Sequence, residues 1–249
     1  MSAPLMRAEG LAKRFGALTA ADDVSFSLDE GRLVALIGPN GAGKTTLINL
    51  ISGSLRADAG HIFFDAADIS ALDMPARSRL GLARSFQIAT VLVEYSALEN
   101  VALAVQARSG SSFRFWRSAA AEEALNRVGM EALGTLGVAA QAAMHAGALS
   151  HGEKRRLEIA IALAQAPKLL LLDEPMAGAG ADETRGLVHT LKGLRRRYTI
   201  VLVEHDMQAV FALADRVSVL VEGRIIATGT PEAVRKDAAV RAAYLGDAA

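Results

Sequence analysis

The chain has 249 residues, 51% of them hydrophobic, which suffices for one large domain or two small ones with a real core. Its 27 Lys and Arg residues balance its 27 Asp and Glu residues, so it lacks the basic excess of proteins that bind mainly nucleic-acid phosphates. It contains no cysteine, which excludes disulfides and thiolate zinc sites and suits a cytosolic protein.

No membrane-crossing segment is predicted. The first ten residues lack the apolar core of a signal peptide. The longest stretch without formal charge, residues 132–152, is rich in Ala and Gly and contains Gln141, His145 and His151. If the protein works at a membrane, we expect it to do so through a partner.

The N-terminal segment predicts short, mostly antiparallel strands. Residues 6–30 alternate apolar and polar side chains, with glycines between them. Phe15 follows the basic pair Lys13-Arg14 and precedes Gly16. These residues leave two interpretations of Phe15 open: an exposed platform for a purine ring, or an ordinary core aromatic.

The segment GPNGAGKTT, which starts at Gly38, matches G-x-x-x-x-G-K-[ST], the phosphate-binding loop of nucleoside triphosphatases. Its glycines let successive backbone N–H groups point into one concavity, and the helix starting near Gly43 adds the positive end of its dipole. Lys44 is expected to reach the β- and γ-phosphates, and the Thr45 hydroxyl to lie on Mg²⁺. Two elements frame the loop: a buried strand at residues 32–37 and a helix that closes on Gly53.

The middle of the chain changes from strands to helices. Residues 58–70 predict a short strand and turn, and residues 79–87 a strand that leads to the polar Gln87. From residue 88 to about 148 alanine increases and helical periodicity dominates, with a small-residue break at 109–116. This pattern is typical of a helical insertion.

Two further motifs follow the insertion. Ser150 is a plausible N-cap with Glu153 three residues later, a capping-box arrangement that predicts a helix start. Residues 168–175 form an apolar strand that ends in Asp173 and Glu174. Such a strand belongs in a parallel sheet, and ligands collect at the carboxyl ends of such strands. With a phosphate loop upstream, this is the expected position for magnesium binding and water activation.

The C-terminal part predicts one more buried strand, at residues 199–206, with His205 at its tip. A histidine in that place, beside strands that carry phosphate chemistry, favours a functional role over a structural one. A hairpin is predicted at residues 216–231 around Glu222, and a single terminal helix at residues 231–245.

The order of these motifs resembles the ATP-binding-cassette (ABC) ATPases over almost the entire chain. LSHGE, which contains Ser150 and Gly152, is similar to that family's signature LSGGQ, with His151 and Glu153 as replacements. The resemblance implies an α/β fold: a phosphate-loop NTPase core with a mostly parallel sheet, an N-terminal antiparallel β-subdomain and an inserted helical subdomain. It implies one domain over residues 1–249. The core with its β-subdomain would comprise residues 1–87 and 165–249, and the helical subdomain with the signature would comprise residues 88–164.

The resemblance extends to a subfamily. GLARSFQ, ALENVALA, RRLEIA, VEHDM and the ending RAAYLGDAA resemble the longer ATPase subunit of bacterial branched-chain amino acid importers, with urea and amide importers as close relatives. This implies a cytoplasmic subunit, peripheral on the inner face of the plasma membrane, that binds and hydrolyses ATP with Mg²⁺. The implied partners are a second ATPase subunit, identical or a shorter sister, membrane permease subunits and, indirectly, an external solute-binding protein.

Two other functions stay open beside this one. The cassette subunit of a lipid or lipopolysaccharide exporter would share every catalytic residue. A soluble cassette ATPase acting on ribosomes or DNA usually carries two cassettes or a long coiled-coil insertion, and this chain has neither. The balanced charge also counts against it, so no nucleic-acid partner is expected.

The resemblance also implies roles for individual residues. Phe15 would stack on adenine, Glu174 would be the general base for the attacking water, and Gln87 and His205 would contact the water and the γ-phosphate respectively. The remaining implied contacts are, for the phosphates, Asn40, Gly41, Gly43, Lys44, Thr45 and Thr46; for Mg²⁺, Thr45, Gln87 and Asp173; and for the γ-phosphate of a second subunit, Ser150 and Gly152.

One position departs from the family pattern. The loop after the Asp-Glu pair usually ends in Asp or Asn, whereas Gly180 stands there in this chain. The side-chain contact that this residue makes across the dimer is therefore lost, which leaves the strength of coupling between the two sites open.

Overall fold

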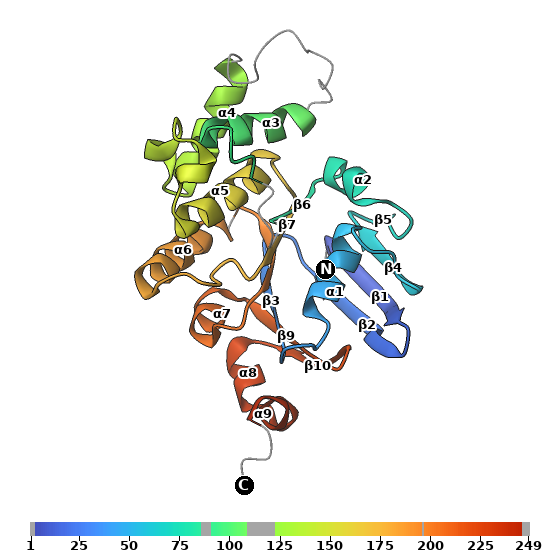
Figure 1. Ribbon diagram of the computed structural model, residues 1–249. Helices are drawn as coiled ribbons and strands as arrows, with labels where there is room; N and C mark the ends of the chain where they lie inside the picture. The colour runs from blue at the N-terminus through green and yellow to red at the C-terminus, as the bar shows by residue number, and fades with distance from the viewer. Residues whose placement is uncertain (1–2, 86–90, 109–122, 196, 246–249) are drawn as a thin grey trace. The chain divides into compact units, whose positions relative to one another are not determined.

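The computed structural model describes residues 3–85, 91–108, 123–195 and 197–245. The chain divides into two compact units, residues 1–77 with 192–249, and residues 78–191 (Figure 1). None of the helices in these ranges has the length and apolar character that a bilayer span requires.

The first unit contains a four-stranded antiparallel sheet with the order β2-β1-β4-β5. Its strands are β1 (Met6–Phe15), β2 (Leu18–Leu28), β4 (Ala59–Phe64) and β5 (Ala67–Asp68). The antiparallel prediction is confirmed, but the prediction of several short strands is wrong. β1 and β2 run for 10 and 11 residues because Gly10, with a φ of +59°, lies in a register shift inside β1 and does not end it.

The same unit holds the central parallel strands. β3 (Leu33–Ile37) lies between β8 (Thr199–Val203) and β9 (Arg216–Val221), parallel to both, and β10 (Arg224–Gly229) runs antiparallel to β9. All residues of β3 and β8 are buried, as continuous apolar runs in a parallel sheet should be. The predicted hairpin is confirmed: Glu222 joins β9 to β10 with a φ of +47°.

Helices α1 (Lys44–Ser52), α2 (Met74–Arg79) and α7 (Met207–Leu213) complete the middle of this unit. α1 ends at Gly53, which has a φ of +80° and caps the helix, as predicted. The sequence did not predict α2 or α7. The start of α7 had a readable signal, because the carboxylate of Asp206 accepts hydrogen bonds from two N–H groups of its first turn.

The prediction of a single terminal helix is wrong. The structure has two helices, α8 (Pro231–Lys236) and α9 (Ala238–Leu245). Asp237 between them is extended, with φ −65° and ψ 128°, and its Oδ1 accepts a hydrogen bond from the N–H of Val240 at 3.1 Å. An Asp that can cap a new helix competes with continuing the old one.

The second unit combines two parallel strands with a group of helices. β6 (Leu82–Arg84) pairs with β7 (Leu169–Asp173) in the predicted parallel sense. The helices, of which α3, α4 and α5 pack on one another, are α3 (Ala97–Arg108), α4 (Glu123–Thr135), α5 (His151–Ala164) and most of α6 (Ala181–Leu194).

The predicted helical segment at 88–164 falls within this unit, and its boundaries with the core stay a prediction. The predicted break at residues 109–116 lies outside the described residues. The α/β class, the parallel core strands and the antiparallel N-terminal sheet are confirmed.

Candidate active site

The phosphate loop joins β3 to α1 and is preformed around its lysine. The side chain of Lys44 is 7% exposed, and its Nζ donates hydrogen bonds to the main-chain oxygens of Gly38 (2.7 Å) and Pro39 (2.9 Å). Asn40 and Gly41 at the tip of the loop are exposed. The ammonium group therefore lies inside the curve of its own loop, where a phosphate would meet it.

The N-terminal turn of α1 carries the two predicted threonines. Thr45 is exposed and Thr46 half-buried, and no acidic residue or side-chain cap occupies this turn. The first N–H groups of a helix have no intrahelical partner and lie at the positive end of its dipole. This turn can therefore accept an anion.

At one glycine of the loop, Gly43, close packing disfavours a side chain in addition to the left-handed backbone. Gly43 has a φ of +101°, and a Cβ added there would overlap the main-chain oxygen of Ala20 in β2. Gly41 has a φ of +79°, yet a Cβ there would meet nothing within 4 Å. The two positions thus share a left-handed backbone and differ in the space around them.

Replacing Gly43 by Ala is expected to cost about 2–5 kcal/mol of unfolding free energy, the sum of left-handed strain and steric overlap. Gly41→Ala, with strain alone, should cost about 1–2 kcal/mol. Urea unfolding of both variants measures the difference. Equal losses at the two positions would contradict the packing explanation.

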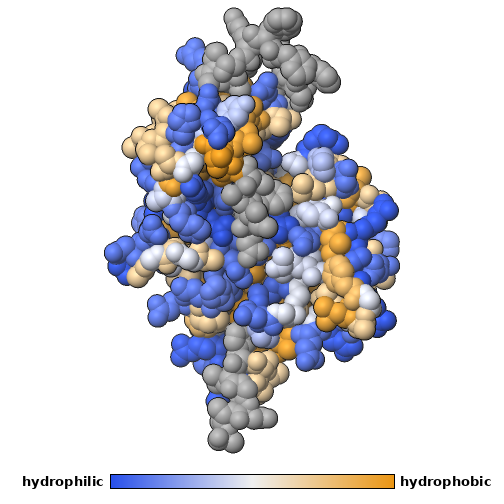
Figure 2. All heavy atoms as spheres, in the orientation of Figure 1, coloured by the Kyte–Doolittle hydropathy of each residue, from blue (hydrophilic) through white to orange (hydrophobic). Residues whose placement is uncertain are grey.

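Phe15, at the end of β1, is 48% exposed, and the Nζ of Lys13 lies 5.7 Å from the centre of its ring. Hydrophobic residues appear on the surface among hydrophilic ones in Figure 2. Among the described residues of this unit, the large ones that are more than a third exposed are Phe15, Leu18, Leu72 and Ile226. The interpretation of Phe15 as an ordinary core aromatic is therefore wrong, and its role as an adenine platform stays a prediction.

Phe15→Ala is expected to weaken ATP binding by about 1–3 kcal/mol, the range of base–aromatic stacking. Binding of inorganic triphosphate should change much less, because that ligand has no base to stack. Titration of the variant with each ligand measures both effects. A loss that is the same for ATP and triphosphate would exclude stacking as the role of this ring.

His205 lies at the same edge of the sheet as the phosphate loop. Leu36 of β3 pairs with Val203 of β8 in parallel, so the residues that follow both strands emerge side by side. The His205 side chain is 63% exposed. The main-chain N–H of His205 donates to the buried carboxylate of Glu204 at 3.1 Å. The first unit thus brings together the loop and the histidine.

In the second unit, β7 ends in the buried Asp173. Its Oδ2 accepts a hydrogen bond from Arg84 at 3.1 Å, whereas its Oδ1 has no hydrogen-bond partner among the described residues. Burial raises the pKa of Asp173, and the neighbouring Arg84 partly offsets this effect. An anionic oxygen without a donor is a suitable acceptor for water bound to Mg²⁺.

Protein side chains alone do not build a metal cage in the described ranges, since no three acidic, histidine or cysteine residues gather there. Mg²⁺ keeps several waters and is usually held by one or two carboxylates together with substrate phosphates. A single buried carboxylate such as that of Asp173 therefore fits a magnesium ion that arrives with a nucleotide.

Glu174 follows with a strained backbone. It is half-buried, and its φ of +47° is left-handed although Pro175 follows it. A conformation of this kind costs about 1–3 kcal/mol and persists only where its surroundings fix it. Its main-chain oxygen accepts hydrogen bonds from the N–H of Ala177 (3.1 Å) and from Arg155 (3.0 Å).

The signature segment starts α5 with the predicted capping box. The hydroxyl of Ser150 accepts from the N–H of Glu153 at 3.3 Å, and the Glu153 carboxylate accepts from the N–H of Ser150 at 2.8 Å. The bond from the Ser150 main chain lowers the pKa of Glu153. Ser150 is exposed, so its capping role leaves the hydroxyl accessible.

The two glycines near this helix start differ in their surroundings. A Cβ on Gly152 would overlap the carboxylate of Glu183 on α6, so a side chain there would displace the end of that glutamate. A Cβ on Gly180 would meet nothing within 4 Å, and its N–H donates to Glu183 at 3.2 Å. Among the residues of this unit that the structure describes, none would clash with a side chain at position 180.

Gln87 lies outside the described residues, and two other residues escaped the sequence interpretation. Arg155 is buried, the side chain of Arg84 is 7% exposed, and each contacts the Asp173-Glu174 pair. The signal for Arg84 was a cation at the end of an apolar strand. Arg155 lies between apolar positions of an amphipathic helix, where a sequence gives no sign of its partner.

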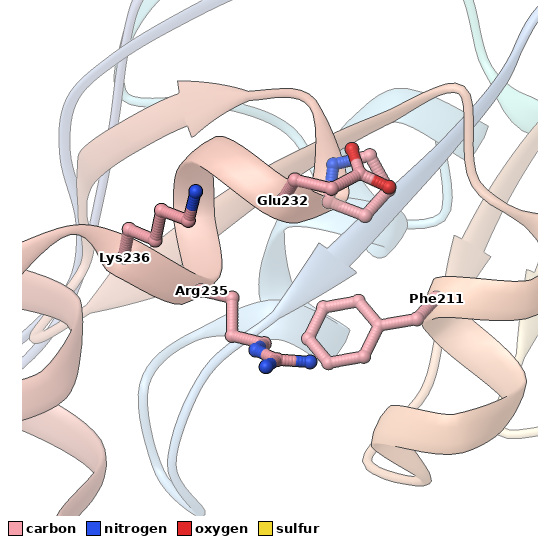
Figure 3. Close-up of a pocket in the computed structure, with 5 residues that line it drawn as sticks. Phe211, Glu232, Arg235 and Lys236 are labelled. Atoms are coloured by element: carbon pink, nitrogen blue, oxygen red, sulfur yellow. The ribbon is translucent and has the colours of Figure 1, made fainter.

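One hollow lies apart from the predicted site residues. It has a volume of about 270 Å³ and is lined by Phe211 of α7 and by Pro231, Glu232, Arg235 and Lys236 of α8. Figure 3 shows the side chain of Arg235 beside the ring of Phe211. None of the residues predicted for nucleotide chemistry lines it.

Comparisons with known proteins give the chain its family. Residues 21–177 match a family model described as "ABC transporter", and residues 224–249 match one described as "Branched-chain amino acid ATP-binding cassette transporter". The chain is 38% identical to the high-affinity branched-chain amino acid transport ATP-binding protein LivG of Salmonella typhimurium over the full length of both. It is 36% identical to the lipopolysaccharide export system ATP-binding protein LptB of Acidithiobacillus ferridurans, over 98% of this chain and 97% of that one.

A crystal structure of the ADP conformation of an ATP-binding cassette of an ABC transporter has a TM-score of 0.86 and 31% identity, covering 99% of this chain and 100% of that one. The resemblance inferred from the motifs is therefore confirmed by sequence and by structure. The first family model spans more than half of the chain and the curated relatives span all of it. The chain belongs to the ABC transporter family, as one of its ATPases.

Proposed function

We propose that this chain binds and hydrolyses ATP with Mg²⁺ as a subunit of an importer for branched-chain amino acids or related small amides. The observation that carries the solute class is the match of residues 224–249 to the branched-chain amino acid cassette model. The full-length identity to LivG supports it. The lipopolysaccharide exporter is the alternative, supported by a similar identity to LptB over nearly the full length.

The proposal assigns each part of phosphoryl transfer to individual residues. The loop from Asn40 to Thr46 would hold the phosphates, with the Nζ of Lys44 on the β- and γ-oxygens. Thr45 and Asp173 would hold Mg²⁺, which neutralises charge on the phosphates when bound. Glu174 would accept the proton of the attacking water, and His205 would contact the γ-phosphate.

The exposed signature supports the partners that we propose. Ser150 presents a hydroxyl at a helix start, where N–H groups and the dipole favour an anion. It would bind the γ-phosphate on a second ATPase subunit, so the site is completed by association, a form of induced fit. The closing pair would drive permease subunits from the cytoplasmic face of the membrane, with an external binding protein delivering the solute.

Co-purification and uptake test this proposal in the source organism. We expect a tagged chain to carry two permease subunits from detergent-solubilised membranes. We expect deletion of its gene to abolish uptake of labelled leucine, isoleucine or valine. The wild-type gene should restore uptake, whereas a Lys44→Ala variant, which lacks the phosphate-binding ammonium, should not. Normal uptake in the deletion strain, with lipopolysaccharide export components on the tagged chain, would favour the alternative.

A further inference from the structure

One face of α5 contacts the main chain that follows β7. The Nε2 of His151 lies 3.4 Å from the main-chain oxygen of Ala177, and an Nη2 proton of Arg155 is donated to the main-chain oxygen of Glu174 at 3.0 Å. Residues four apart lie one above the other on a helix. The two side chains therefore contact both ends of the turn at residues 174–177.

Arg155 is held firmly for this contact. It is 9% exposed, and its Nη1 donates to the carboxylate of Glu158, one turn further along α5, at 2.9 Å. Glu158 is itself 8% exposed. A guanidinium is a rigid planar fork, so two bonds to two different acceptors fix its direction. A lysine ammonium is a compact charge on a flexible stem and cannot reproduce this pair of bonds.

The hydrogen bond from Arg155 is accepted by the strained main chain of Glu174, the candidate base itself. Glu174 has a left-handed φ of +47° directly before a proline, a combination that the chain would not adopt unaided. Its main-chain oxygen has two acceptor positions, and Ala177 and Arg155 fill both. Because the backbone angles of a residue set the direction of its Cα–Cβ bond, holding this peptide also fixes the direction in which the Glu174 side chain leaves the backbone.

We infer that Arg155 is a positioning residue that aims Glu174 for hydrolysis. The inference rests on the proposed function, in which Glu174 is the base and Ser150 meets the nucleotide of a second subunit. Ser150 and Arg155 lie within the first turn and a half of the same helix. Binding of α5 to the partner's nucleotide therefore acts on the subunit's own base. This link does not use position 180, where the side chain usual in the family is missing.

Arg155→Lys is the first test, made on the purified full chain. We expect ATP affinity and KM to stay within twofold of wild type and kcat to fall at least tenfold, because the charge remains and the peptide is released. Arg156→Lys is the matched control. Arg156 is the next residue on α5, and its guanidinium lies near Gly186 of α6. The kcat of the Arg156→Lys variant should match that of the wild-type protein. An unchanged kcat in Arg155→Lys would overturn the inference.

Glu158→Gln separates positioning from packing. It removes the charge of the pair, but the side-chain oxygen of Gln can still accept the hydrogen bond from Arg155. The guanidinium therefore keeps both of its bonds, and kcat should stay near wild type even if the melting temperature falls. A loss of kcat equal to that of Arg155→Lys would show that packing alone matters, and would overturn the inference.

A double variant gives the last test. In a Glu174→Gln background, single-turnover hydrolysis should not fall further when Arg155→Lys is added, because the two residues act as one unit. A further tenfold loss would overturn the inference. High activity of Glu174→Gln by itself would instead overturn the proposed base, and the two failures are thus distinguishable.

Discussion

Replacing Glu174 by Gln is expected to lower the rate of ATP hydrolysis by about 10²–10⁴-fold while ATP binding is retained. An amide has the shape of the carboxylate but cannot accept the proton of the attacking water. The strained backbone at this position is held by hydrogen bonds to its main-chain oxygen. Glutamine has the same main-chain oxygen, so we expect the backbone of the variant to keep this conformation. The variant should therefore accumulate as an ATP-bound pair of subunits.

Steady-state hydrolysis, nucleotide titration and gel filtration with ATP measure the three parts of this expectation. Glu131→Gln is a suitable control, because Glu131 is an exposed carboxylate on α4 of the same unit. It should leave the rate unchanged. Turnover near the wild-type rate in Glu174→Gln would remove Glu174 from the mechanism.

Ser150→Asp is expected to abolish turnover that depends on subunit association, with folding and ATP binding by the single subunit unchanged. Asp is as good an N-cap as Ser, so α5 should start normally. In the associated pair, however, its carboxylate would face the partner's γ-phosphate. Two like charges at about 4 Å repel by ~4 kcal/mol at an effective dielectric constant of 20, or about 10³-fold in the closing equilibrium.

Ser150→Asn is the matched variant, because Asn is an equally good N-cap and carries no charge. Hydrolysis measured against protein concentration, with the cognate partner subunit added if self-association is weak, compares the two. Only in the Asp variant should the rate of hydrolysis per subunit no longer rise with protein concentration. If Ser150→Asp behaves like wild type in this assay, Ser150 serves only its own helix.

Local patterns account for what the sequence predicted well. The phosphate loop, the glycine at the end of α1 and the capping box at Ser150 each depend on residues within a few positions of one another. The buried strands β3, β7 and β8 were evident because a strand covered on both faces is apolar throughout.

What the sequence could not predict depends on residues far apart or on competing local choices. Arg155 has no readable partner until the fold brings it to the main chain of Glu174. The terminal helix was predicted as one because helical periodicity continues through Asp237, whose side chain nonetheless starts a second helix. The roles of the site residues stay predictions, since they concern a nucleotide and a second subunit.

The position of β3 has a consequence for biosynthesis. The phosphate loop follows β3 early in the chain, yet both neighbours of that strand, β8 and β9, belong to the last quarter of the chain. The first residue of β3, Leu33, donates its N–H to Asp215, 182 residues away. Contacts between such distant residues form only after the intervening chain exists and its closure entropy has been overcome. A nascent chain thus carries the loop residues long before it can hold them in shape, and nucleotide binding is a property of the nearly finished protein.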